Sequence, residues 1–86
     1  MTVYGLINRH NEKNPGSHYF DRDTLRFFGE RISEMRVPKQ VETVKDLSGN
    51  EHKCYCLSTL QHNAPGGSRR AYYYFDVETF KRVLTD

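Results

Sequence analysis

The sequence of 86 residues has no tryptophan, only two cysteines and three prolines, and no long hydrophobic run. Its apolar stretches are a few residues long, as at positions 71–75, whereas roughly 18 to 20 apolar residues are needed to cross a bilayer. The N-terminal residues also lack the hydrophobic region of a signal peptide. We therefore expect a soluble, cytoplasmic protein without a membrane-spanning segment.

The two cysteines, Cys54 and Cys56, are separated by a single residue. A disulfide between them would close a small strained ring and would not staple distant parts of the chain. The disulfide-rich class of small secreted domains is therefore excluded, and we expect both side chains to be reduced thiols.

The sequence also lacks an excess of one charge, with 13 Lys and Arg against 11 Asp and Glu. Both signs are spread along the chain, so no basic arm is present that could bind nucleic acid by charge alone. A chain of this length forms one domain, here residues 1–86, and is too short for a doubly wound nucleotide-binding sheet or a barrel.

A helix start is the clearest local signal in the sequence. Asp21 suits the N-cap position, where a carboxylate accepts the first free amide protons, and Phe20 and Leu25 have the spacing of a hydrophobic staple. Apolar residues then recur at helical intervals, at Leu25, Phe28, Ile32 and Met35. The pattern predicts the main helix over residues 22–34, with this apolar face in the core.

A similar signal occurs near the C-terminus, where residues 74–81 match residues 19–26 in kind at nearly every position. Both segments contain an aromatic pair, an Asp, an acidic residue two positions later and then a Thr. Convergence on a good helix start and an internal duplication both explain the match. Either way, the pattern predicts a short helix over residues 77–84.

The intervening segments have the pattern of strands. Residues 39–47 and 53–60 flank the turn signal Ser48-Gly49-Asn50, and residues 71–75 are strongly β-prone. Residues 2–8 suit either an edge strand or a short helix. The predicted fold is therefore α+β: an antiparallel sheet of three strands, or of four with the N-terminal segment, packed on the main helix.

Residue types used in catalysis and metal binding are present without a local signature. His52, Cys54 and Cys56 share one face of a predicted strand and suit zinc or copper, but such positions are about 6.6 Å apart and no second cysteine pair completes a site. The simpler interpretation is two buried thiols beside an exposed imidazole. No motif places a nucleophile beside a base, so we expect no enzyme, no metal and no cofactor.

The aromatic strand and the segment before it carry the candidate binding site. Tyr73 and Phe75 share the face that we expect in the core, which places Tyr72 and Tyr74 on the opposite face. The preceding segment, residues 62–70, has no periodicity and is predicted to be a long loop, which is often functional. The predicted partner-binding residues are Tyr72, Tyr74, Arg69, Arg70, His62 and Asn63.

Exposed tyrosine beside arginine suits two kinds of partner. It is typical of protein-binding hot spots, and it also suits stacking on the bases of single-stranded nucleic acid. A third possibility is that the first helix or the N-terminal segment covers this face. The sequence does not separate these alternatives.

Residues 18–33, with the sequence HYFDRDTLRFFGERIS, resemble a segment of small, largely uncharacterised proteins of bacteriophages, plasmids and other mobile elements. The resemblance implies a compact accessory protein inside a bacterial cell, and it implies no reaction. Mobile-element proteins of this size often bind and block, as anti-CRISPR proteins do. By that analogy we expect a non-enzymatic inhibitor that contacts host nucleic-acid machinery, such as a defence nuclease. The alternative function is direct binding of single-stranded DNA or RNA. The third is a metal-binding or enzymatic protein.

Overall fold

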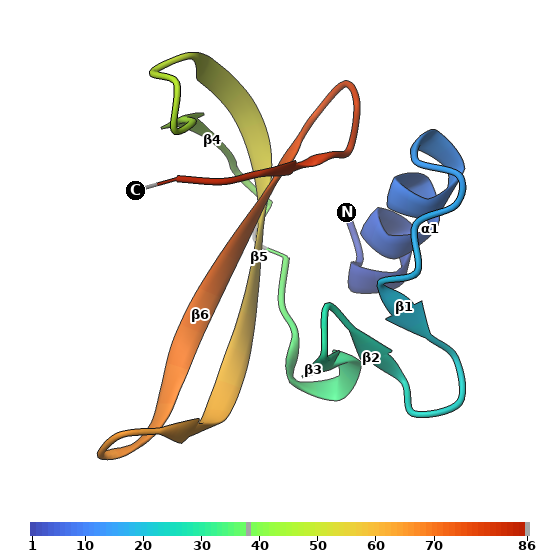
Figure 1. Ribbon diagram of the computed structural model, residues 1–86, viewed down its shortest axis with the longest axis vertical. Helices are drawn as coiled ribbons and strands as arrows, with labels where there is room; N and C mark the ends of the chain where they lie inside the picture. The colour runs from blue at the N-terminus through green and yellow to red at the C-terminus, as the bar shows by residue number, and fades with distance from the viewer. Residues whose placement is uncertain (38, 86) are drawn as a thin grey trace.

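The computed structural model describes residues 1–37 and 39–85, except for the side chains of Asn63 and Ala64. The fold is α+β, with one α-helix, a short 3-10 helix and two antiparallel sheets (Figure 1). In chain order the elements are α1 (Val3–Lys13), β1 (Phe20–Asp21), β2 (Arg26–Phe27), β3 (Glu30–Arg31), the 3-10 helix η1 (Ile32–Glu34), β4 (Val41–Lys45), β5 (Glu51–Ala64), β6 (Gly67–Asp76) and β7 (Arg82–Val83).

Helix α1 lies at the N-terminus, where the sequence was compatible with either a strand or a helix. Thr2 begins it, because its hydroxyl oxygen accepts a hydrogen bond from the amide of Gly5 at 3.0 Å. The helix ends at Lys13, after which the amide of Asn14 donates to the carbonyl of His10. The helical alternative for this segment is therefore correct.

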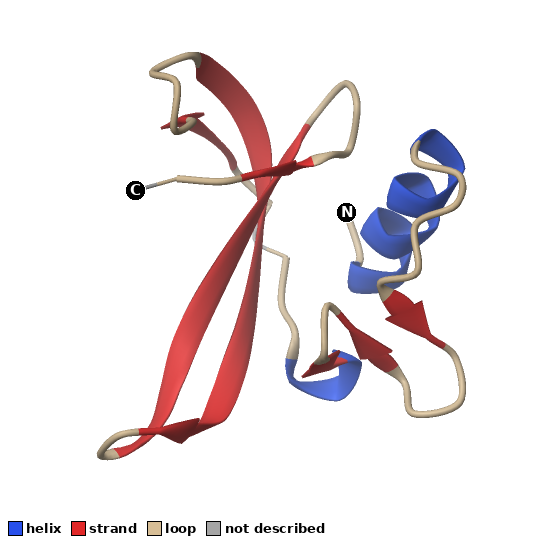
Figure 2. Cartoon of the chain, viewed as in Figure 1, coloured by secondary structure: helices blue, strands red, loops and turns tan. Residues whose placement is uncertain are grey.

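The predicted main helix over residues 22–34 is wrong, because this segment forms strands β2 and β3, with η1 at its end (Figure 2). The carboxylate of Asp21 does accept the amide protons of Asp23 and Thr24, at 2.9 and 3.3 Å, as an N-cap would. However, Leu25 has a φ of 53°, which turns the chain back into β2 instead of continuing a helix. The same cap chemistry therefore closes a hairpin.

A second turn joins β2 to β3 and involves Phe28 and Gly29, whose φ values are 53° and 78°. Positive φ at both central residues is the mark of a type I′ turn. Of the four residues expected on a buried helical face, Ile32 and Met35 are buried, but Leu25 is 51% exposed. Phe27, which the helical pattern placed off that face, is fully buried.

The predicted C-terminal helix over residues 77–84 is also wrong. The carboxylate of Asp76 accepts the amides of Glu78 and Thr79, at 2.8 and 3.1 Å, and Phe80 has a φ of 55°. The chain then returns as β7 and pairs with β6. Residues 74–81 thus repeat the turn of residues 19–26, so the similarity in sequence is also a similarity in backbone conformation.

Strands β4 to β7 form a four-stranded sheet in chain order. The predicted hairpin over residues 39–47 and 53–60 and the predicted strand over residues 71–75 are confirmed as β4, β5 and β6. Residues 62–70 are not a long loop, because β5 and β6 pair as far as Ala64 and Gly67, and Pro65-Gly66 forms the turn. Figure 1 shows the resulting β5–β6 hairpin running along the molecule.

The core lies between the helix, the small sheet and one face of the β5–β6 hairpin. Its fully or nearly fully buried apolar residues are Leu6, Ile7, Phe27, Ile32, Met35, Leu57 and Phe75. Among the described residues, no helix combines the length and the apolar character needed to cross a membrane.

Substitution of Leu25 by glycine tests the hairpin that replaces the predicted helix. A non-glycine residue at positive φ costs about 1 kcal/mol, so we expect Leu25→Gly to raise the free energy of unfolding by about that amount. In a helix, glycine would instead lower it by about 1 kcal/mol. A urea titration of both proteins distinguishes the two signs, and a destabilised variant would contradict the hairpin.

Truncation of Phe27 tests its place at the centre of the core. We expect Phe27→Ala to lower the free energy of unfolding by about 3 to 5 kcal/mol, because it removes a fully buried ring and leaves a cavity. Urea denaturation measures the change. A loss below about 1 kcal/mol would show that the ring is not buried as described.

Candidate partner-binding site

The predicted aromatic face is present on strand β6. Side chains alternate along a strand, so Phe75 and Tyr73 face the core while Tyr72 and Tyr74 face the other side. Phe75 is fully buried, and Tyr73 packs against the core cluster. Tyr72 is 56% exposed and Tyr74 is half-buried. The assignment of the two faces is confirmed.

Arg36 joins this face from a segment that the sequence did not connect with it. Its amide and carbonyl exchange two hydrogen bonds of 2.8 Å with Ser58 on β5, in an isolated antiparallel bridge. Ser58 in turn pairs with Tyr72 on β6. Because paired residues point to the same face, Arg36, Ser58 and Tyr72 form a row across the sheet. No sequence periodicity could have revealed this contact, since a single bridge makes it.

Arg70 lies on the same side of the sheet, because it is two residues before Tyr72 on β6. Its guanidinium donates to the Ser58 hydroxyl oxygen at 3.5 Å. We call Arg36, Ser58, Arg70, Tyr72 and Tyr74 the aromatic–basic face. It combines two exposed arginines with one exposed and one half-buried tyrosine on a single side of the hairpin.

Two of the predicted site residues lie elsewhere. The Arg69 guanidinium donates to the Gln61 amide oxygen at 3.2 Å, and a His62 ring nitrogen lies 2.7 Å from the carboxylate of Glu34. Both line a polar cleft of about 420 Å³ between the hairpin and the β3–η1 segment. The structure therefore does not bring Arg69 and His62 together with Tyr72. The predicted Asn63 side chain lies outside the described residues.

The cysteines lie on the same side of the sheet as the aromatic–basic face, in its buried part. Cys54 and Cys56 are free and buried, as expected, and Cys56 pairs with Tyr74. Burial raises the pKa of Cys54 to about 11 and also raises the pKa of Cys56, so both thiols are protonated near neutral pH. Within the part of the chain that the structure describes, no group of three or more His, Cys, Asp or Glu side chains is placed to hold a metal ion.

His52 is only partly exposed, contrary to the exposed imidazole that we expected, because two aspartates enclose it. Its Nε2 lies 2.7 Å from a carboxylate oxygen of Asp46, and its Nδ1 lies 3.0 Å from one of Asp76. Only the protonated ring can donate from both nitrogens. The hydrogen bonds that the ring donates to Asp46 and Asp76 accordingly raise the pKa of His52 above its ordinary value.

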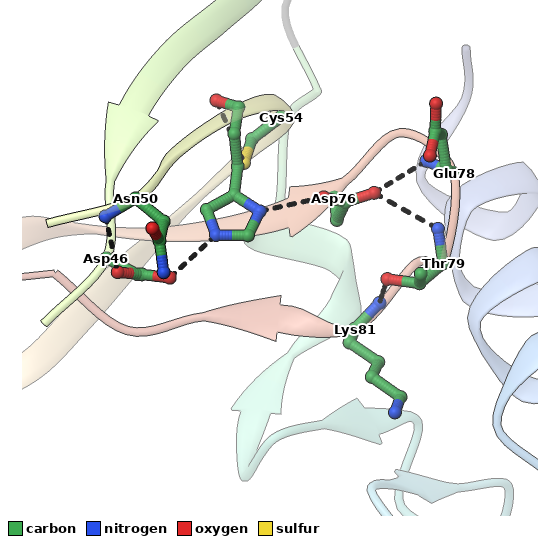
Figure 3. Close-up of polar contacts among 8 residues, drawn as sticks. Asp46, Asn50, Cys54, Asp76, Glu78, Thr79 and Lys81 are labelled. Carbon is green, nitrogen blue, oxygen red and sulfur yellow. Dashed lines mark hydrogen bonds and ion pairs between the residues drawn. The ribbon is translucent and has the colours of Figure 1, made fainter. Parts of the chain in front are cut away.

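Each aspartate of this cluster uses its other carboxylate oxygen to close a turn (Figure 3). Asp46 accepts the amides of Ser48 and Asn50, and Asp76 accepts those of Glu78 and Thr79. The cluster therefore joins the β4–β5 turn to the β6–β7 turn. An imidazolium with both nitrogens engaged cannot serve as a general base, so the geometry favours a structural role. The sequence signals for this cluster are the two turns that begin at Asp46 and Asp76. We interpreted the turn at Asp76 as the cap of a helix.

Comparisons with known proteins found no related protein. No protein-family model matches the chain, and neither curated proteins nor solved structures are significantly similar to it.

A pH titration tests the His52 cluster. Below the ordinary pKa of 6.5 the ring is protonated in both the folded and the unfolded chain, so its bonds to Asp46 and Asp76 contribute fully. As the pH rises through the elevated folded-state pKa, the ring loses a proton and this contribution to stability disappears. We expect NMR to give His52 a pKa above 6.5.

The acid side of the same cluster behaves in the opposite way. Hydrogen bonding from His52 lowers the pKa of Asp46, so its contribution is present above the ordinary pKa and is lost as the pH falls through the lowered value. Asp46→Asn removes the negative charge and should lower the pKa of His52. A His52 pKa that stays unchanged in this variant would contradict the contact.

Proposed function

We propose that this protein is a non-enzymatic binding protein that engages a partner protein through the aromatic–basic face. The observation that carries the proposal is the row formed by Arg36, Ser58 and Tyr72, in which Tyr72 is 56% exposed. Tyrosine and arginine are the residue types most often found at the energetic centres of protein interfaces.

The backbone that carries the face is held by the sheet before any partner binds. Its tyrosines stand on β6, whose opposite face contributes Phe75 to the core and leaves the backbone little freedom. The hydrogen bond from Arg70 to Ser58 restrains one arginine, and the two-bond bridge fixes the backbone of Arg36. Such preorganisation lowers the entropy lost on binding, which favours affinity from a small surface.

The partner class follows from the resemblance of residues 18–33 to mobile-element proteins. Proteins of such elements act inside a bacterial host, so the proposed partner is a host protein that processes nucleic acid, such as a defence nuclease complex. On this proposal the protein inhibits by occupying a surface of that partner. The mode of action is the anti-CRISPR-like one, without a cofactor and without chemistry.

Direct binding of single-stranded DNA or RNA is the second candidate function, favoured by one observation. Arg36 and Arg70 belong to the same face as Tyr72, as a nucleic-acid surface requires for contacts to phosphates beside a stacked base. The two functions differ in their response to salt. Phosphate contacts make the logarithm of the affinity fall steeply with the logarithm of the salt concentration.

The test is a pull-down from lysate of a bacterial host, run with and without nuclease treatment and followed by identification of the bound proteins. We expect a nucleic-acid-processing protein to be retained by the native chain. Tyr72→Ala should lose it, because truncating an interface hot spot costs about 2 kcal/mol or more, which is about a 30-fold loss of affinity. Tyr4→Ala is the matched control, since Tyr4 is 49% exposed and lies on α1 instead of β6.

The outcomes separate the alternatives. Loss of the same partner in both variants would contradict the assignment of the surface. Retention that depends on nucleic acid and weakens steeply with salt would replace the protein partner by single-stranded DNA or RNA. Specific retention that survives nuclease treatment and disappears only with Tyr72→Ala supports the proposal.

A further inference from the structure

A second concave site lies on the other side of the sheet, between the end of α1 and β7. Its volume is about 740 Å³, within the range of small-molecule sites. Arg82, which lines it, pairs with Phe75 and therefore lies on the core side of the sheet, opposite Tyr72. The cavity is thus separate from the aromatic–basic face.

The lining of this cavity is cationic. Lys13, from the last turn of α1, lines it together with Arg82 on β7 and Lys81 just before β7, while no Asp or Glu lines it. Across residues 1–37 and 39–85, none of these three cations forms an ion pair. Three uncompensated positive charges in one concave site favour an anionic ligand.

Arg82 is held in place by aromatic rings. Its guanidinium carbon lies 4.5 Å from the ring centre of Tyr73 and 5.7 Å from that of Phe28. A guanidinium so placed remains able to donate two parallel hydrogen bonds to a phosphate or a carboxylate.

Two residues of the cavity lining, His10 and Ser17, carry buried polar atoms. His10 is 3% exposed, and its Nδ1, like the Oδ1 of the neighbouring Asn11, forms no hydrogen bond among the described residues. The hydroxyl of Ser17 is likewise buried without a partner there. Unsatisfied buried polar atoms are uncommon in native proteins, so this lining is not an ordinary packed surface.

An aromatic wall completes the site. Tyr19 stacks on Phe28, with ring centres 4.1 Å apart and planes 9° apart, and is 51% exposed. One face of the Tyr19 ring is therefore occupied, and the rest is open to a planar ligand. Both rings line the cavity beside the three cations.

We propose that this cavity binds a nucleotide, with its phosphate between Lys13, Lys81 and Arg82 and its base against the open face of Tyr19. Cations supply the contacts to the phosphate, and the aromatic ring supplies stacking to the base. A nucleotide uses both the cations and the aromatic ring, whereas a simple anion would use only the cations. The proposal is independent of the partner-binding function, because no residue of the aromatic–basic face lines the cavity.

The test is a titration of the 15N-labelled protein with adenosine 5′-monophosphate, with adenosine and inorganic phosphate as comparators. We expect the monophosphate to shift amide signals of residues 13–19 and 81–84, and to bind at least tenfold more tightly than either comparator. Equal affinity for inorganic phosphate would overturn the nucleotide assignment. Absence of shifts at millimolar monophosphate would overturn the site.

Two double variants distinguish binding in this cavity from non-specific electrostatic attraction to the protein surface. Lys13→Gln with Lys81→Gln should weaken monophosphate binding by about tenfold or more, because hydrogen bonds to a charged group are lost. The matched control is Lys39→Gln with Lys45→Gln, which removes the same charge from residues that do not line the cavity. Equal losses in the two pairs would overturn the proposal.

The stacking contact has its own variants. Tyr19→Phe keeps a flat ring and should retain the affinity for the monophosphate, whereas Tyr19→Ala should lose about tenfold. Chemical shifts distant from residue 19 show whether each variant is folded. An unchanged affinity in folded Tyr19→Ala would contradict the placement of the base.

Discussion

Aspartate carboxylates that accept backbone amides set the hairpins on which this structure depends. Asp21, Asp46 and Asp76 each end a strand, or directly follow one, and each accepts two amides of the following turn. The turns determine which residues pair across β1–β2, β4–β5 and β6–β7. Because a slip of one residue would exchange the two faces of a strand, these carboxylates also decide that Phe75 is buried and Tyr72 exposed. His52 then joins two of the three turns through the remaining carboxylate oxygens.

The same carboxylate chemistry explains what the sequence predicted and what it did not. An Asp that accepts the amides two and three residues later begins a helix or closes a hairpin, and the two outcomes differ only in the residues that follow. Leu25 and Phe80 adopt positive φ, which closes the hairpin instead of continuing a helix. Positive φ is rare for such side chains, so the residue types did not predict it. The strands β4 to β6 could be predicted because their alternation and turn residues are local. The row through Arg36 could not, because it depends on a tertiary contact.

Packing explains how bulky residues tolerate this backbone. Phe80 is buried, and its ring stacks on Tyr55 with centres 5.6 Å apart, while Phe28 stacks on Tyr19 and packs beside Phe75. Aromatic contacts of this kind are worth about 0.5 to 1.5 kcal/mol each beyond burial, which is comparable to the cost of positive φ. Leu25 has the same backbone conformation while half exposed. Its strain is therefore the least compensated of the three.

The long hairpin separates two surfaces that can act independently. One side of β6 carries the tyrosines of the aromatic–basic face, and the other side reaches the cationic cavity through Phe75 and its partner Arg82. The core side of the sheet between them is filled by buried apolar residues. A partner on one face therefore leaves the cavity accessible, and a ligand in the cavity contacts no residue of the face. Coupling between the two would have to pass through β6 and β7, whose register is fixed by Asp76.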